Sequence, residues 1–289
     1  MIKYFSFILL FLYSTWLCAT VQADTLPVKI PEGAVPVKSF KNNIIFQARI
    51  NDSIPIKALF DIGAWGLAVP EKWRKNKDKP EKYEQIRLEV GSWTKTMFAT
   101  FLLADSQFLN WYGDDCVLLG WDFFNRRIIE VSYNYHYVKE LTRRELNEIS
   151  GYDVLKIENR GRRLLVDGEV IIDGQKIAGK YWLDTGLNGT MFLAQNILSK
   201  YGLNAKLVKS GKAKNLDSDK SKINLIMADT IRVGNSILTR KDIIFSNSEW
   251  FVFKENNIYV GLIGNQFFKN FSVIFDFQEN NLYLKPIEN

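Results

Sequence analysis

Two short motifs in the sequence place an aspartate where an apolar strand would otherwise continue. Asp61-Ile62-Gly63 follows the run KALF, and Asp184-Thr185-Gly186 follows the run KYWL. Burying an unpaired carboxylate costs several kcal/mol, so each aspartate needs a partner. Two carboxyl groups that meet at about 3 Å share one proton, because two charges at that distance repel by roughly 5 kcal/mol. The protonated group can then polarise a carbonyl while the ionised group takes a proton from water.

The two motifs belong to a repeat that runs through the chain. Asp61 and Asp184 lie 123 positions apart, each between two apolar stretches. The block IRLEVGSWTKTMFATFLLAD (86–105) matches TIRVGNSILTRKDIIFSN (230–247) at an offset of 143, and VLLGWDFFNRRIIEVSY (117–133) matches GLIGNQFFKNFSVIFDF (261–277) at 144. Three matched blocks in the same order indicate a tandem duplication. Because equivalent loops of two such lobes meet at their pseudo-twofold axis, we expect the two aspartates to face each other.

Short runs of β-branched and aromatic residues, bounded by Gly, Asn and Asp, dominate the rest of the chain. Such runs are typical of strands, so the sequence predicts a mostly β protein with two lobes. The second copy carries about 20 extra residues near 205–225, a polar stretch that we expect to form a long exposed hairpin or loop. We place the lobes at 24–137 and 159–289, joined by a charged, helical linker at 138–158.

The first 23 residues have the pattern of a cleavable secretory signal. Lys3 precedes an apolar run, and Val21 and Ala23 are the small residues before the expected cleavage point. An uncleaved N-terminal anchor is the alternative, since the apolar run could nearly span a bilayer. With cleavage, we expect an exported protein, periplasmic or secreted, with no stable membrane insertion.

Composition narrows the possible chemistry further. The net charge is +6 and the basic residues are spread along the chain, which does not favour a nucleic-acid surface. The single histidine, His136, excludes a His-rich metal site, and its alternating aromatic context predicts a residue on a strand surface. Cys116, the one cysteine beyond the signal, is expected to pack in the core. We therefore expect no metal and no cofactor, and a monomer.

On these motifs the sequence resembles the aspartic proteases, and within them the bacterial secreted retropepsin-like proteins that carry two lobes in one chain. The resemblance covers about residues 40 to 289. It is carried by Asp61-Ile62-Gly63-Ala64, Asp184-Thr185-Gly186, Leu118-Leu119-Gly120 and Leu262-Ile263-Gly264. It implies a pepsin-like or retropepsin-like fold with a pseudo-twofold axis, and an endopeptidase that acts on peptide or protein substrates.

The resemblance also implies roles for individual residues. Asp61 and Asp184 would be catalytic, with no metal or cofactor. The apolar-apolar-Gly strands would pass beneath the active-site loops and support them. The expected supporting residues are Gly63, Thr185, Gly186, Gly120 and Gly264. The extra residues near 205–225 resemble a flap over the substrate, and RKNKDKPEKYEQ (74–85) resembles a reduced one.

Ile62 departs from the pattern of this family. Thr or Ser is expected there, because its hydroxyl donates to the backbone of the opposite lobe. Thr185 can make its half of this contact, whereas Ile62 cannot. Three hypotheses therefore stand: an exported aspartic endopeptidase, a catalytically weak or inactive pseudo-protease that binds peptides, and a structural exported β-protein whose Asp-x-Gly motifs are only tight turns.

Overall fold

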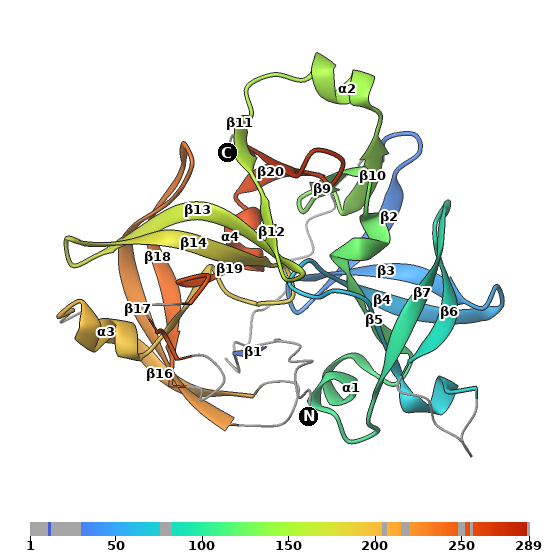
Figure 1. Ribbon diagram of the computed structural model, residues 1–289, viewed down its shortest axis with the longest axis horizontal. Coiled ribbons are helices and arrows are strands. Elements are labelled where there is room, and N and C mark those ends of the chain that lie inside the picture. The colour runs from blue at the N-terminus through green and yellow to red at the C-terminus, as the bar shows by residue number, and fades with distance from the viewer. Residues whose placement is uncertain are drawn as a thin grey trace, which may run out of the picture.

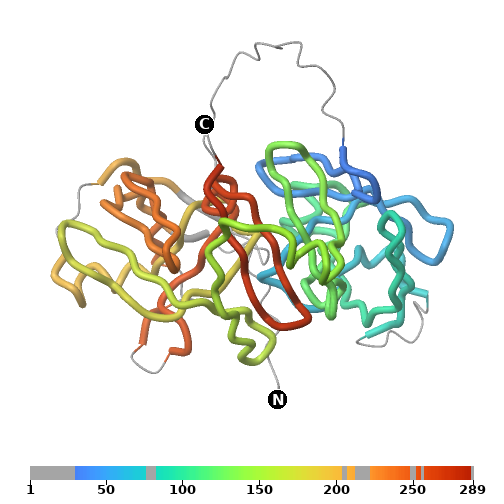
Figure 2. The backbone as a smooth tube through the Cα atoms, turned by 90° about the horizontal axis from the view of Figure 1, so that it is seen from above, coloured from blue at the N-terminus to red at the C-terminus, as the bar shows by residue number. Residues whose placement is uncertain are grey.

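The computed structural model describes residues 11–12, 30–75, 83–203, 207–214, 220–247, 252–254 and 257–287. Strands predominate and form two lobes, one for each half of the chain (Figure 1). Seen from above, the blue-to-green first half and the yellow-to-red second half lie side by side (Figure 2). The expectation of a mostly β, two-lobed chain is confirmed.

The first half contains β1 (Phe11–Leu12), β2 (Val35–Phe40), β3 (Asn43–Ile50), β4 (Ile54–Asp61), β5 (Leu67–Pro70), η1 (Glu71–Trp73), β6 (Glu84–Val90), β7 (Trp93–Leu102), α1 (Gln107–Tyr112), β8 (Cys116–Gly120), η2 (Trp121–Phe124), β9 (Ile128–Ser132) and β10 (Tyr137–Leu141). The second contains α2 (Arg143–Glu148), β11 (Asp153–Lys156), β12 (Glu158–Arg160), β13 (Arg163–Ile172), β14 (Gln175–Asp184), β15 (Met191–Ala194), α3 (Asn196–Lys200), β16 (Leu207–Lys214), β17 (Lys220–Val233), β18 (Ser236–Ser246), β19 (Gly261–Gly264), α4 (Asn265–Phe268), β20 (Phe271–Asp276) and β21 (Asn281–Pro286).

The two halves pair their strands in the same way. Each aspartate ends a strand that runs parallel to an apolar-apolar-Gly strand, β4 with β8 and β14 with β19. The strand after each aspartate loop, β5 or β15, pairs antiparallel with that same glycine-ending strand and parallel with a further strand, β7 or β18. The corresponding hairpins, β6–β7 and β17–β18, are also antiparallel. The offsets in the sequence therefore match equivalent positions in the fold.

Burial follows from where each strand lies in its sheet. The short strands β5, β8, β15 and β19 are buried at every position, as expected for strands covered on both faces. In β6, Ile86, Leu88 and Val90 point inward, whereas Gln85 and Arg87 are exposed. This alternation is that of a strand with one solvated face. The innermost strands are thus those that carry the aspartate loops and their supports.

The lobes meet along the pairing of β9 with β20, which are the next-to-last strands of the two halves. The apolar core continues across this boundary. Phe60 packs edge to face with Phe275 at 6.5 Å between ring centroids, and Trp121 stacks on Phe277 at 6.0 Å. The relative position of the two lobes is therefore fixed by strand pairing and by aromatic packing.

The segment 138–158, expected as a surface linker, contains the end of β10, helix α2 and strand β11. Helix α2 begins with a capping box, in which Thr142 and Glu145 satisfy each other's backbone amides. The guanidinium of Arg143 binds the buried carboxylate of Asp276 at 2.6 and 3.1 Å. Strand β11 pairs with β21. The connection between the halves is thus attached to the second lobe.

Several local predictions need correction or fall outside the described residues. His136 lies in the turn between β9 and β10 with a positive φ of 54°, and not on a strand. The helix expected at 138–154 is limited to α2. Of the expected signal, only Phe11–Leu12 is described, as a strand beside β16. Residues 76–82 of the expected short flap lie outside the described part.

In the described parts of the chain, no helix has both the length and the apolar character needed to cross a membrane.

Candidate active site

The two aspartates lie at the ends of equivalent strands, on loops that meet between the lobes. Asp61 is the last residue of β4 and Asp184 the last of β14. Their exposed fractions are 1% and 0%. The structure therefore brings together, in the interior, two carboxyl groups that the sequence separates by 123 positions.

The glycines that follow the apolar pairs leave room for the aspartate loops. Gly120 is in register with Asp61 on β4, and Gly264 with Asp184 on β14. A Cβ atom on Gly120 would lie 2.7 Å from the carbonyl oxygen of Gly66, and one on Gly264 would lie 2.9 Å from Leu187 Cδ2. Real Cβ atoms do not approach so closely, so both positions require glycine. Strands β8 and β19, which end in these glycines, thus pack directly against the two aspartate loops.

Backbone amides from both loops bind the Asp61 carboxylate. Oδ1 of Asp61 accepts hydrogen bonds from the amides of Gly63 at 2.8 Å and Gly186 at 3.2 Å. Gly186 belongs to the opposite lobe. Oδ1 of Asp184 accepts one hydrogen bond from the amide of Leu187 at 2.9 Å. The two carboxyl groups therefore differ, because Asp61 has the better set of donors for a negative charge.

The glycines of the two loops permit the carboxyl groups to come together. A methyl group on Gly63 would lie 2.6 Å from Cγ of Asp184, and one on Gly186 would lie 2.6 Å from Oδ2 of Asp61. The two carboxyl groups are within hydrogen-bonding contact of each other. Oδ2 of Asp184 is fully buried, and no donor from the described residues reaches it. A shared proton on that oxygen satisfies both groups.

Burial determines the protonation of the pair. It raises the pKa of Asp61 from its usual 3.8 to about 6, although the amides of Gly63 and Gly186 and the hydrogen bond with Asp184 oppose the rise. Burial, followed by the negative charge of Asp61, raises the pKa of Asp184 well above its usual value. As the pH rises, Asp61 therefore ionises first, while Asp184, beside the new negative charge, holds its proton more strongly. The pair can supply a base and an acid together.

Thr185 fastens the two loops together through its hydroxyl. Oγ1 donates to the carbonyl oxygen of Phe60 at 3.0 Å and accepts from the amide of Ile62, also at 3.0 Å. Both partners belong to the first lobe. Ile62 is fully buried in the apolar core and has no hydroxyl to return the contact. The interlobe contact predicted for Thr185 is therefore present, and it consists of two hydrogen bonds to the first lobe.

Asn43, which the sequence motifs did not identify, braces the second loop from the first lobe. This buried side chain donates to the carbonyl oxygens of Thr185 at 2.8 Å and Gly186 at 3.1 Å. The hydroxyl of Tyr112 in turn donates to Oδ1 of Asn43 at 3.3 Å. The only signal in the sequence is the Asn42-Asn43 pair between two apolar runs, which indicates a turn but not its reach across the lobes.

A cavity of about 420 Å³ adjoins the second aspartate loop. Its walls include Asn188 and Thr190 from that loop and Leu225 from β17.

Two lysines give this cavity its charge. The ammonium groups of Lys269 and Lys241 line it and donate to the neutral amide oxygens of Asn42 at 2.8 Å and Asn270 at 3.3 Å, respectively. Burial lowers the pKa of Lys269. Asp242 also lines the cavity but is exposed. None of the ion pairs recorded among the described residues includes either lysine, so the cavity has an excess of positive charge.

The expected flap corresponds to a hairpin of two long strands. Strand β16 pairs antiparallel with β17, from Leu207 opposite Ile226 to Lys214 opposite Lys220. Residues 204–206 and 215–219 lie outside the described residues. Leu225, near the open end of the hairpin, lines the same cavity as Asn188. The hairpin therefore begins next to the aspartate loops.

Other reactive side chains lie elsewhere. Cys116 is buried at the start of β8, and burial raises the pKa of its thiol to about 12. Such a thiol stays protonated and is not a nucleophile at neutral pH. His136 is exposed in its turn. In the described part of the chain, no three or more His, Cys, Asp or Glu side chains are grouped to hold a metal ion.

No protein-family model matches the chain, and comparison with curated proteins gives no match. The fold and the site together define a mostly β protein of two lobes with a pair of buried carboxyl groups at their junction.

Proposed function

We propose that the protein is an exported aspartic endopeptidase with a pepsin-like, retropepsin-like fold, in which Asp61 and Asp184 activate water for peptide-bond hydrolysis. One observation carries the proposal: carboxyl groups from equivalent turns of the two lobes meet in the interior, and Oδ2 of Asp184 has no donor among the described residues. A structural turn would need only the local amide bonds to Gly63 and Leu187. It would not need two abutting carboxyl groups, which destabilise each other.

In the proposed reaction the two aspartates act as base and acid. The ionised carboxylate of Asp61 takes a proton from water, and the water oxygen attacks the carbonyl carbon of the peptide. The protonated carboxyl of Asp184 donates to the carbonyl oxygen as negative charge develops there. The tetrahedral intermediate then collapses: the C–N bond breaks, the proton that Asp61 took from water passes to the leaving nitrogen, and Asp184 regains its proton from the hydroxyl group as the carbonyl re-forms. No covalent intermediate is needed.

Substrate must reach a pair that is almost completely covered. The exposed fractions of 1% and 0% mean that a peptide contacts Asp61 and Asp184 only after neighbouring residues move. The β16–β17 hairpin is the proposed flap, because it begins beside the second aspartate loop. An extended peptide would pair with its strands through main-chain hydrogen bonds. Export is proposed from the signal pattern at residues 1–23.

The positive cavity next to Asn188 suggests a preference in the substrate. Among the described residues, Lys269 and Lys241 donate to amide oxygens and form no recorded ion pair, so an acidic side chain of the peptide would give them a charge partner. We therefore propose that an acidic residue near the cleaved bond favours binding. Replacing Lys269 with Met should reduce this preference while cleavage of neutral peptides continues.

The test is cleavage of a diverse peptide pool between pH 3 and pH 7. Mass spectrometry would compare the parent protein with Asp61→Asn, Asp184→Asn and Lys269→Met. The proposal expects cleavage by the parent, none in either aspartate variant, and fewer acidic residues near the cut sites of Lys269→Met. Cleavage that persists in an aspartate variant would refute the catalytic assignment.

Ile62 favours a second candidate, a pseudo-protease that binds peptides without hydrolysing them. Its side chain cannot return the contact that Thr185 makes, and misplacement of a catalytic group by about 1 Å costs roughly a hundredfold in rate. Peptide binding by the parent without cleavage at any pH would support this candidate over the enzyme.

A further inference from the structure

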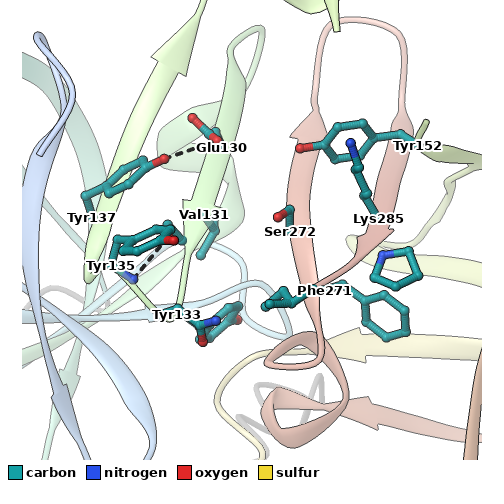
Figure 3. Close-up of a pocket in the computed structure, with 13 residues that line it drawn as sticks. Glu130, Val131, Tyr133, Tyr135, Tyr137, Tyr152, Phe271, Ser272 and Lys285 are labelled. Atoms are coloured by element: carbon teal, nitrogen blue, oxygen red, sulfur yellow. Dashed lines mark hydrogen bonds between the residues drawn. The ribbon is translucent and has the colours of Figure 1, made fainter. Parts of the chain in front are cut away.

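A second cavity, of about 460 Å³, lies where the sheets of the two lobes separate. Strands β9 and β20 pair as far as Val131 opposite Val273, and beyond this pair they diverge. The cavity opens at that point, between the β9–β10 turn on one side and the ends of β20 and β21 on the other (Figure 3). It shares no lining residue with the aspartate loops or with the cavity beside Asn188.

Aromatic side chains supply much of its wall. Tyr135 and Tyr137 come from the turn side, whereas Tyr152 comes from the segment before β11 (Figure 3). Tyr133 and Phe271 lie at the end opposite Glu130 (Figure 3). Cavities of about 300 to 1000 Å³ with such walls and a few polar groups are typical of sites for small molecules.

One wall carries the carboxylate of Glu130. Glu130 is half-buried, and its Oε1 accepts a hydrogen bond of 3.3 Å from the hydroxyl of Tyr137. Lys139, opposite Glu130 on β10, instead pairs with Glu145 at 2.9 Å. No ion pair of Glu130 is recorded among the described residues, and burial raises its pKa. A cation in the cavity would relieve this cost.

The opposite wall carries the ammonium group of Lys285. The ammonium of Lys285 lies 5.9 Å from the ring centroid of Tyr152 and donates weakly to the carbonyl oxygen of Ser150 at 3.5 Å. Within the described residues it forms no ion pair with a carboxylate. Figure 3 shows Glu130 and Lys285 on strands on either side of the gap, with Ser272 between them. The cavity thus presents two opposite charges with aromatic rings nearby.

We propose that this cavity binds a zwitterion, namely an amino acid or a dipeptide with an aromatic side chain. Its ammonium group faces Glu130 and the ring of Tyr137, a setting that favours cations through both charge and the aromatic face. Its carboxylate faces Lys285. The aromatic side chain packs toward Tyr133 and Phe271. This site is separate from the aspartate pair and does not depend on the proposed catalysis.

The experiment is isothermal titration calorimetry of the full chain carrying Asp61→Asn, so that no ligand can be cleaved. The probes are the dipeptide Ala-Phe and two blocked forms, N-acetyl-Ala-Phe and Ala-Phe amide. The proposal expects Ala-Phe to bind and each blocked form to bind about tenfold more weakly, which corresponds to about 1.4 kcal/mol.

Variants separate the two charges. Glu130→Gln should weaken Ala-Phe about tenfold and leave N-acetyl-Ala-Phe unchanged, because that ligand has no ammonium group to lose a partner. Lys285→Met should also weaken the binding of Ala-Phe about tenfold, and it should leave the binding of Ala-Phe amide unchanged because that ligand has no carboxylate. Exposed residues away from the cavity provide matched controls, Glu32→Gln and Lys254→Met, which should not alter binding.

Three outcomes would overturn the proposal: no binding of Ala-Phe at millimolar concentration, equal binding of free and blocked forms, or equal loss in the variants and their controls. Thermal unfolding of each variant by circular dichroism distinguishes a lost contact from a damaged fold. The Glu130→Gln side chain can still accept from Tyr137, so its melting temperature should stay close to that of the parent.

Discussion

The hydroxyl of Thr185 accepts a hydrogen bond of 3.0 Å from the amide of Ile62, a residue of the opposite lobe. The same oxygen donates to the carbonyl of Phe60, so one side chain of the second loop is tied at two points to the strand that ends in Asp61. The positions of the two carboxyl groups therefore depend on each other.

Replacing Thr185 with Ala should destabilise the protein. The change leaves the carbonyl of Phe60 and the amide of Ile62 without their buried partner, which costs about 2 to 4 kcal/mol in the free energy of unfolding. Urea denaturation measures it. Thr185→Ser keeps the hydroxyl and should lose less than half as much. Equal stability of Thr185→Ala and the parent would show that the contact does not hold the lobes.

Replacing Ile62 with Thr should give the first loop the hydroxyl that Thr185 supplies in the second loop. By the equivalence of the two lobes, it would donate to the backbone of the β14 strand before Asp184. Ile62→Val is the matched control, because Val and Thr have nearly the same shape and only Thr can donate. We expect Ile62→Thr to exceed Ile62→Val in peptide hydrolysis and by about 1 kcal/mol in stability. Identical behaviour of the two variants in both assays would contradict this role for the position.

Replacing Asn43 with Ala should loosen the second loop from a distance. Two buried carbonyl oxygens, of Thr185 and Gly186, lose their donor, so we expect a loss of about 2 to 3 kcal/mol in the free energy of unfolding and slower hydrolysis. Asn159→Ala, at an exposed position of β12, is the control. If both variants unfold at the same urea concentration as the parent, the brace has no energetic role.

The protein should lose stability as pH rises through the titration of the aspartate pair. Burial raises the pKa of Asp61 from 3.8 in the unfolded chain to about 6 in the folded protein, so the folded state binds more protons in this window. Stability therefore falls with rising pH, by about 2 kcal/mol between pH 4 and pH 6 for this group. The double variant Asp61→Asn/Asp184→Asn should lack this component in urea denaturation at a series of pH values. A parent and a double variant with parallel pH profiles would argue against paired, buried carboxyl groups.

The parts of the site that lie within one motif were predictable from the sequence. The offsets between repeats indicated that Asp61 and Asp184 hold equivalent positions, and the resemblance carried by the apolar-apolar-Gly motifs implied supporting strands. These inferences worked because each rests on a local pattern that the chain repeats.

The contacts between distant segments were not predictable in the same way. Asn43 reaches Thr185 across 142 positions, and its sequence context indicates only a turn. Lys269 and Asn42 are likewise brought together by the packing of the lobes. His136 was misplaced because the alternating tyrosines continue the strand pattern through a turn, which the positive φ at His136 completes.

The most direct test of the account is a carbon-13 NMR titration of the aspartate carboxyl groups, with assignments from Asp61→Asn and Asp184→Asn. We predict that Asp61 titrates near pH 6 and that Asp184 loses its proton only at a higher pH than Asp61. Two carboxyl groups that titrate independently near pH 4 would contradict it, because groups with ordinary pKa values are neither buried together nor share a proton.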